Sequence, residues 1–152
     1  MIINSLEDML TFGQRIAAQA SGGEVIELLG DVGAGKTTFT KGLAGGLGVT
    51  DPVQSPTFTI SREYVGNRGL RLVHYDFYRL DDAGIMADEV TDVLADPNAV
   101  VVIEWSDTVA HVLPDDRLIL TIELVPDDET ARRLTWRTGG VRSQQLVAGM
   151  EQ

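Results

Sequence analysis

The amino-acid sequence predicts an α/β protein built as a three-layer sandwich, with a mixed β-sheet between layers of helices. Segments with helical spacing of apolar residues alternate along the chain with short β-rich segments, which is typical of a layered α/β domain. The unbroken apolar run Ala99–Ile103 predicts a central strand that is covered on both faces. Two pairs of predicted strands, 57–65 with 70–75 and 118–124 with 132–137, are joined by turn sequences and predict antiparallel hairpins.

Composition limits the class of protein. The chain has 152 residues, 43% of them hydrophobic, and we expect one domain over residues 1–152. It has no cysteine, which excludes disulfides, thiolate catalysis and cysteine-ligated zinc. The longest apolar run is far shorter than the roughly 20 residues that span a bilayer, and the N-terminus does not resemble a signal peptide. We therefore expect a cytoplasmic protein with no membrane segment.

The charge is strongly acidic and unevenly spread. A formal net charge of −11 disfavours a broad nucleic-acid-binding surface, because such surfaces neutralise phosphates with lysine and arginine. Residues 76–129 contain 15 acidic and two basic residues. We interpret this segment mainly as a solvated acidic face. A surface that docks a partner is the alternative, and both interpretations stay open at this point.

The N-terminal third predicts helix, strand, turn and helix in succession. Ser5, with Asp8 three residues later, is typical of a helix start, and the following apolar residues have 3.6-residue spacing, so a helix is predicted over 6–20. Two glycines end it. Val25–Leu29 predicts a short buried strand, which a glycine-rich turn joins to a second helix over 36–47.

The remainder of the chain predicts strands separated by turns, with one acidic helix. β-branched and aromatic residues predict a strand over 57–65, and Gly66–Gly69 forms the turn to its partner. The segment 81–95 predicts a helix, and a short helix is expected from Val141. The apolar residues on the expected buried side of the acidic helix are Ile85, Val90, Val93 and Leu94.

The strongest motif is Gly30-Asp31-Val32-Gly33-Ala34-Gly35-Lys36-Thr37, which matches G-x-x-x-x-G-K-[ST]. Its glycines allow backbone conformations in which amides converge on an anion, and the helix beginning at Lys36 adds its positive end. Lys36 is predicted to reach the β- and γ-phosphates and Thr37 to bind Mg²⁺. A glycine-rich turn without a ligand is disfavoured, because a strand precedes the loop and a helix follows it. The fold is therefore predicted to be P-loop NTPase-like. The predicted nucleotide-binding residues are Asp31, Gly33, Ala34, Gly35, Lys36, Thr37 and Thr38.

Nucleotide hydrolysis of this kind also needs a carboxylate near the metal and its water. Glu104 immediately follows the apolar run of the central strand, and Asp76 follows the strand 70–75, so both are expected where ligands collect in parallel sheets. Either one could touch the metal while the other orients water. Thr57 follows the loop by about 20 residues and is a candidate for a switch-like segment that senses the γ-phosphate. A plain turn before the start of a strand is the equal alternative.

Several other polar and aromatic residues have a simple structural interpretation. His74 is expected to be a strand residue rather than a catalyst, and Arg79 a partner of the acidic helix rather than a charge-stabilising group. Trp105 either packs beside a nucleotide or covers the edge of the core. Five aromatic residues at strand spacing are expected in the core: Phe58, Tyr64, Tyr75, Phe77 and Tyr78.

Four motifs in order carry a family resemblance. They are the loop 30–38, Ser55-Pro56-Thr57-Phe58, His74-Tyr75-Asp76-Phe77-Tyr78-Arg79-Leu80, and Val102-Ile103-Glu104-Trp105. Together they resemble the bacterial TsaE family, the ATPase of tRNA threonylcarbamoyladenosine biosynthesis, over roughly residues 5–137. Two features depart from the family's pattern: Ser106-Asp107 follow the Glu-Trp pair, and 83–93 lacks the usual Leu-Gly-rich pattern.

The resemblance implies a function and partners. It implies an ATPase, using ATP and Mg²⁺, that joins the threonylcarbamoyl transferase and its inactive paralogue, with tRNA contacted only indirectly through that complex. By motif match, Lys36 and the loop amides would bind phosphate, and Thr37 and Glu104 would hold Mg²⁺. Asp76 would act near the metal or its water, and Thr57 would belong to the switch-like loop.

Two other functions are weighed against this one. A small-molecule or nucleoside kinase would need a basic lid, but Arg117 is the only arginine or lysine between Glu104 and Leu124. A nucleotide-dependent binding module without hydrolysis would leave Asp76 and Glu104 superfluous. No arginine near the motifs is an obvious finger, so we expect slow hydrolysis by the chain alone. No base-reading motif is found, and the helix over 6–20 with the loop before it could lie against the base.

Overall fold

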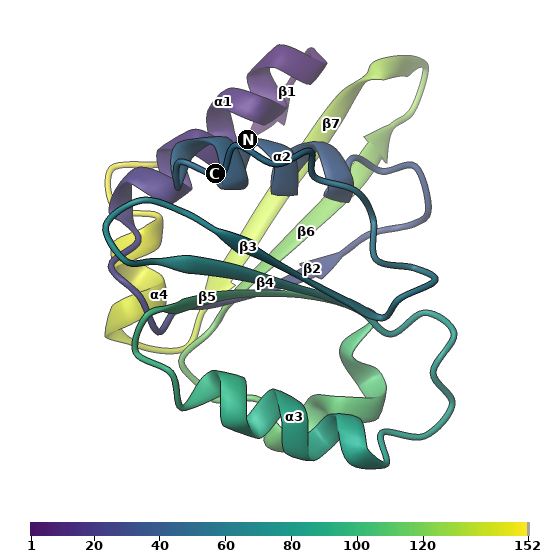
Figure 1. Ribbon diagram of the computed structural model, residues 1–152. Helices are drawn as coiled ribbons and strands as arrows, with labels where there is room; N and C mark the ends of the chain where they lie inside the picture. The colour runs from purple at the N-terminus through teal and green to yellow at the C-terminus, as the bar shows by residue number, and fades with distance from the viewer. Residues whose placement is uncertain (152) are drawn as a thin grey trace.

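The structure is a computed structural model that describes residues 1–151. Within these residues one seven-stranded mixed sheet has the order β1-β7-β6-β2-β5-β4-β3 (Figure 1). The strands are β1 (Ile2–Ile3), β2 (Val25–Leu29), β3 (Ser61–Val65), β4 (Arg71–Asp76), β5 (Ala99–Glu104), β6 (Leu118–Val125) and β7 (Asp128–Thr138). The helices are α1 (Leu6–Gln19), α2 (Lys36–Gly46), α3 (Ile85–Leu94), the 3₁₀ segment η1 (Ser106–Val112) and α4 (Val141–Leu146).

Parallel strands form the middle of the sheet, and antiparallel strands form its edges. β2 pairs in parallel with β5 and β6, and β5 pairs in parallel with β4. The two expected hairpins are present as β3-β4 and β6-β7, and β1 adds to β7 in antiparallel orientation. All six residues of β5 are buried, which confirms the central strand that the apolar run predicted.

Helices cover both faces of this sheet, which gives three layers (Figure 1). α1 and α2 lie on one face, over a core that includes Val100 and Val102 of β5. α3 and η1 lie on the other face, over a core that includes Val101 and Ile103. The alternation along β5 thus divides its side chains between two cores. Within residues 1–151, no helix is both long and apolar enough to cross a membrane.

α1 and α2 approach each other closely through glycines. A Cβ atom at Gly13 would lie 2.5 Å from the Phe39 carbonyl oxygen, and one at Gly42 would lie 2.3 Å from the Leu10 carbonyl oxygen. Neither distance leaves room for a side chain, so the two helix backbones are nearly in contact. This contact fixes α2, and with it the loop that precedes α2, against the rest of the domain.

Two predicted elements begin later than expected. The strand predicted from residue 57 begins at Ser61, because the Pro56 carbonyl accepts hydrogen bonds from the N–H groups of Thr59 and Ile60 and turns the chain. Ile60 has φ of 67°, which a strand does not allow. The acidic helix begins at Ile85 rather than at residue 81 and ends at Leu94.

Some residues expected in the core are exposed instead. Tyr64, Tyr75 and Phe77 are buried as expected, but Phe58 is 84% exposed and Tyr78 is 54% exposed. Ile85, expected on the buried side of α3, is 85% exposed because it is the first residue of the shortened helix. Phe58 lies in the turn that replaces the start of the predicted strand, so strand spacing does not apply to it.

Three features of the fold were not predicted. β1 is only two residues long and pairs with a distant strand. η1 follows Trp105, whose left-handed φ of 56° turns the chain out of β5. β7 begins at Asp128 rather than at residue 132. The short strand β1, the segment η1 and the first residues of β7 have no clear apolar periodicity of their own.

The helix contact provides a test of the fold. Gly42→Ala should lower the free energy of unfolding by about 1–3 kcal/mol, since the added methyl group overpacks the contact with the Leu10 carbonyl. Gly45→Ala is a matched control on the same helix, because a Cβ there meets nothing within 4 Å. Alanine's higher helix propensity should make it neutral or stabilising by up to about 1 kcal/mol. Denaturant unfolding measures both, and equal losses would contradict the close approach.

Candidate functional site

A cavity of about 340 Å³ opens where the central parallel strands end. It is lined by Val32, Gly33, Gly35, Lys36, Thr37, Thr38, Ser55, Thr57, Asp76, Tyr78, Glu104 and Trp105. These residues come from the loop before α2 and the first turn of α2, from the turn before β3, and from the ends of β4 and β5 with the residues that follow them. Most of the site residues predicted from the sequence therefore lie around one cavity, which we name the first cavity.

The sheet register brings the two predicted carboxylates together. Glu104 is paired with Leu28 of β2 on one side and with Asp76 of β4 on the other. Both carboxylate residues are strand termini, and they are 3% and 5% exposed. Because parallel strands run in the same direction, their carboxyl ends share one edge of the sheet.

The loop between β2 and α2 turns sharply and ends at an uncapped helix. Gly33 and Gly35 have φ values of 82° and 115°, in the region that favours glycine. A Cβ at Gly30, with φ of 149°, would lie 2.5 Å from the Ile122 carbonyl oxygen, so this glycine is also required by the close passage of β6. No side chain caps the N-terminus of α2, which leaves its first amides facing the first cavity with the positive end of the helix dipole.

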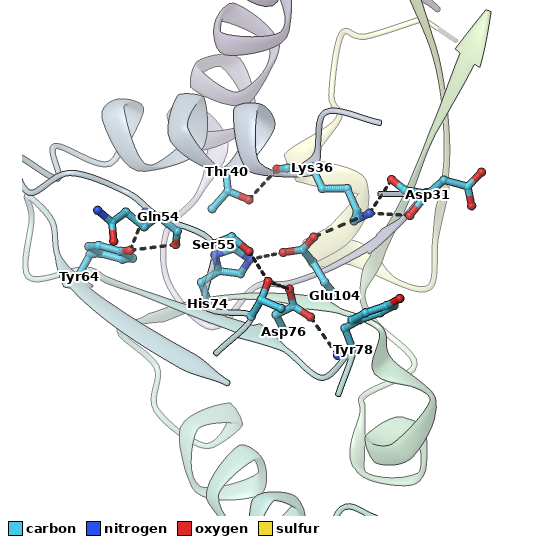
Figure 2. Close-up of polar contacts among 12 residues, drawn as sticks. Asp31, Lys36, Thr40, Gln54, Ser55, Tyr64, His74, Asp76, Tyr78 and Glu104 are labelled. Carbon is cyan, nitrogen blue, oxygen red and sulfur yellow. Dashed lines mark hydrogen bonds and ion pairs between the residues drawn. The ribbon is translucent and has the colours of Figure 1, made fainter. Parts of the chain in front are cut away.

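Lys36 is buried between the loop and β5. Its Nζ donates hydrogen bonds to the carbonyl oxygens of Gly30 (2.5 Å) and Asp31 (3.0 Å), and it lies 4.0 Å from Glu104 Oε1 (Figure 2). It also lies 5.3 Å from the centre of the Trp105 ring, a favourable place for a cation. The ammonium group is thus held at the boundary between the loop and the carboxylate edge of the sheet.

Glu104 has a second partner that the sequence did not reveal. His74 Nε2 lies 2.7 Å from Glu104 Oε2, and both side chains are buried (Figure 2). His74 is a strand residue, as expected, but its ring also holds one oxygen of Glu104 and leaves the other turned to Lys36. The signal available in the sequence was the strand spacing: His74 lies two residues before Asp76 and so on the same face of β4.

Asp76 is held by a backbone amide and by the turn before β3. Its Oδ1 accepts a hydrogen bond from the Tyr78 N–H, and its Oδ2 accepts one from the Thr57 hydroxyl, both at 3.0 Å (Figure 2). The Ser55 hydroxyl lies 2.8 Å from that of Thr57. The predicted switch-like residue therefore touches one of the two carboxylates directly.

Two other predictions for this region need revision. Arg79 was expected to pair with the acidic helix, but its guanidinium lies 4.7 Å from the centre of the exposed Phe58 ring, and no ion pair joins it to α3 among residues 1–151. Trp105, for which two positions were open, covers the edge of the core beneath α3 and also lines the first cavity.

A second cavity of about 600 Å³ adjoins the first on the side of α1. The two share Gly33, Gly35 and Thr38. The remaining lining residues are Asn4, Ser5, Leu6, Glu7, Met9, Ala34, Glu129, Thr130 and Arg132. Ala34 therefore belongs to the second cavity and not to the first, whereas Asp31 lines neither. The Asp31 side chain is exposed, and only its carbonyl oxygen reaches Lys36.

The chemistry of the first cavity suits a ligand that is anionic and carries a cation. Uncapped amides and Lys36 attract negative charge, while Glu104, Asp76 and the Thr37 hydroxyl present oxygen ligands of the kind that Mg²⁺ prefers. Among residues 1–151 no group of three or more histidine or acidic side chains is arranged to hold a metal by itself. A metal here would take part of its coordination from the ligand, as Mg²⁺ does with phosphates.

Comparison with known proteins gives consistent matches. Residues 3–134 match the family described as "Threonylcarbamoyl adenosine biosynthesis protein TsaE". The protein of that name from Bacillus subtilis is 43% identical over 141 residues, covering 92% of this chain and 85% of the relative. The one from Streptomyces coelicolor is 40% identical over 124 residues, covering 79% and 82%.

A solved structure agrees with the sequence comparison. The crystal structure of Bacillus subtilis YdiB superposes with a TM-score of 0.77 at 35% identity, covering 96% of this chain and 88% of that one. The family match spans β1 to most of β7 and so includes every residue that lines the first cavity. The chain therefore belongs to the TsaE family, whose members take part in tRNA threonylcarbamoyladenosine biosynthesis.

Proposed function

We propose that this chain is a Mg²⁺-dependent, P-loop NTPase-like ATPase that hydrolyses ATP to ADP and phosphate and so supports turnover of the transferase that makes threonylcarbamoyladenosine. The observation that carries the proposal is the position of Lys36. Its ammonium group lies between the loop carbonyls and Glu104, in the same cavity as the uncapped start of α2. Positive charge beside a buried carboxylate supports a phosphate site next to a metal site.

Phosphate binding falls to the loop before α2. The amides of Gly33, Gly35, Thr37 and Thr38 belong to a loop and a helix start that line the first cavity. Lys36 would exchange its contacts with the two loop carbonyls for contacts with phosphate oxygens, which are stronger acceptors because they are charged. The left-handed conformations of the two glycines cost little, so the loop holds this arrangement before the ligand arrives.

Thr37 and Glu104 fit a magnesium site. His74 occupies Glu104 Oε2, which leaves Oε1 directed toward Lys36 and the first cavity. Thr37 lines the same cavity from the first turn of α2. Mg²⁺ held there would neutralise charge on the phosphates of ATP. Glu104 is fixed by His74 and by its position at the end of a central strand. It would therefore hold Mg²⁺ without having to reorient its own side chain during the reaction.

Asp76 and Thr57 would act on the attacking water. Asp76 lines the first cavity beside Glu104, and its Oδ2 is held by the Thr57 hydroxyl. A carboxylate in this position accepts a hydrogen bond from water and aligns it with the γ-phosphate. Thr57 is half-buried in a turn rather than in a strand, and its hydrogen bond to Asp76 would change when the γ-phosphate is bound or released.

We expect slow ATP hydrolysis by the chain alone, because the site within residues 1–151 has no arginine to stabilise the charge of the transition state. Within the described part of the chain no arginine lines the first cavity. Arg117, the one arginine or lysine between Glu104 and Leu124, is held by Glu27 at 2.6 Å and by the Pro114 carbonyl at 2.8 Å. This fixed arginine does not form the mobile basic lid of a small-molecule kinase, and a partner protein would have to complete the charge stabilisation.

The second cavity is the natural place for the base and ribose of ATP. It shares Gly33, Gly35 and Thr38 with the first cavity and extends toward the start of α1. The partners in this proposal are the threonylcarbamoyl transferase and its inactive paralogue, in the cytoplasm. The exposed carboxylates of Asp88, Glu89 and Asp92 on α3 would repel RNA. The other subunits would therefore contact the tRNA.

Lys36→Ala tests the phosphate site. Hydrolysis of ATP in the presence of the partner proteins should fall by about 100-fold or more, because a buried charge that stabilises the γ-phosphate is removed. Lys41→Ala is the matched control, since Lys41 is exposed on the same helix. Phosphate release and tRNA modification in the reconstituted complex measure the effect. Wild-type modification by Lys36→Ala would falsify the proposed role.

The roles of the two carboxylates are separated by a second experiment. Glu104→Gln should raise the Mg²⁺ concentration needed for half-maximal ATP binding, because a metal ligand loses its charge. Asp76→Asn should lower kcat by about 100-fold while ATP affinity changes little, because it orients only water. Asp107→Asn, an exposed acid near the site, should change neither quantity. The reverse pattern in the two variants would exchange the roles of Asp76 and Glu104.

A further inference from the structure

Arg132 of β7 makes a direct contact with the proposed phosphate-binding loop. Its Nε donates a hydrogen bond of 2.8 Å to the carbonyl oxygen of Ala34, which lies 98 residues earlier in the sequence. Its Nη1 donates to the carbonyl oxygens of Glu129 (2.7 Å) and Ala131 (2.8 Å). The guanidinium is therefore fixed at one end by its own hairpin and holds the loop at the other.

The hairpin that carries Arg132 is itself well ordered by hydrogen bonds. Asp128 Oδ1 accepts from the Thr130 hydroxyl at 2.8 Å and from the N–H groups of Thr130 and Ala131 at 3.0 Å. These contacts, led by the Thr130 hydroxyl, lower the pKa of Asp128. Asp128 is thus ionised at neutral pH and keeps the turn in the conformation that directs Arg132 toward Ala34.

Holding the Ala34 carbonyl has a consequence for the next amide. In a planar trans peptide, the C=O of one residue and the N–H of the next point in opposite directions. The Ala34 carbonyl points to Arg132 on the side of the second cavity, so the Gly35 N–H points the other way. Within residues 1–151 this N–H donates no hydrogen bond to the protein backbone, and Gly35 lines the first cavity.

Among residues 1–151 the Ala34 carbonyl oxygen accepts no hydrogen bond other than the one from Arg132. A half-turn of the Ala34–Gly35 peptide changes ψ of Ala34 and φ of Gly35, and glycine accepts φ of either sign at similar cost. A glycine-rich loop can therefore present either the carbonyl or the amide, and a carbonyl directed at a phosphate would repel it.

We propose that Arg132 is a positioning residue for phosphate binding: by holding the Ala34 carbonyl it directs the Gly35 N–H into the first cavity. The proposal rests on the proposed function, since it concerns the same phosphate site. Arg132 acts through the loop backbone rather than by contact with the phosphates, because it lines the second cavity and not the first. Lysine cannot replace it, since only the planar guanidinium makes all three carbonyl contacts at fixed angles.

The test compares binding of Mg²⁺-ATP with binding of Mg²⁺ and inorganic tripolyphosphate, which has no base or ribose. Titration calorimetry on the full chain should show affinity about tenfold lower for both ligands in Arg132→Ala, the loss expected for one misdirected hydrogen bond to a charged group. Arg132→Lys should also bind both more weakly than wild type. Millimolar methylguanidinium should restore part of the affinity of Arg132→Ala and leave wild type unchanged, a rescue that a purely structural role would not give.

Arg133→Ala is the matched control, because it removes the same charge from the next residue of β7, which is exposed. It should bind both ligands within twofold of wild type. Unchanged binding by Arg132→Ala, an equal loss in Arg133→Ala, or a loss for ATP alone would each overturn the proposal. The last result would instead indicate a direct contact with the base or ribose. If thermal denaturation shows no folding transition for Arg132→Ala, Arg132→Lys is compared with wild type and with Arg133→Ala instead. A wild-type chain that binds neither ligand would refute the proposed function itself.

Discussion

The parallel pairing of β2, β5 and β4 is the constraint on which the rest of the site depends. It sets the end of β2, from which the loop departs, beside Glu104, and it sets Glu104 beside Asp76. A shift of one residue in either ladder would turn Glu104 to the opposite face of the sheet. Such a shift would separate the buried Glu104 carboxylate from His74 and Lys36, which is costly for a buried charge. The partners of Glu104 therefore favour the observed register of the carboxylates.

Buried charge at this edge is stabilised by a chain of contacts. Lys36, Glu104 and His74 are all less than 8% exposed, and each has a partner: the loop carbonyls hold Lys36, Lys36 faces Glu104, and His74 holds Glu104. An unpaired charge in such surroundings would cost several kcal/mol, on the order of 3–5 when one partner of a buried pair is removed. The same contacts that make burial tolerable also fix the directions of the side chains, which is the property a phosphate site needs.

Much of the fold was predictable because its signals are local. The helices α1 and α2, the central strand β5, both hairpins and the loop between β2 and α2 each have a periodicity or a motif within a few residues. The errors arose at the ends of elements, where strand or helix spacing was extended into a turn. The β-rich residues after Pro56 form a turn whose conformation is fixed by backbone hydrogen bonds, and Phe58 and Ile85 are exposed for lack of a surface to cover them.

Local sequence patterns are enough to predict the composition of the site: a glycine-rich loop with Lys36 and Thr37, and carboxylates at the ends of two predicted strands. Each of these features is encoded by residues that are neighbours along the chain and stay close together in any folded structure. The strand order, by contrast, placed His74 against Glu104 across 30 residues and Arg132 against Ala34 across 98. No periodicity encodes such pairs, because each depends on which strands become neighbours in the sheet, and that is decided by packing of the whole chain.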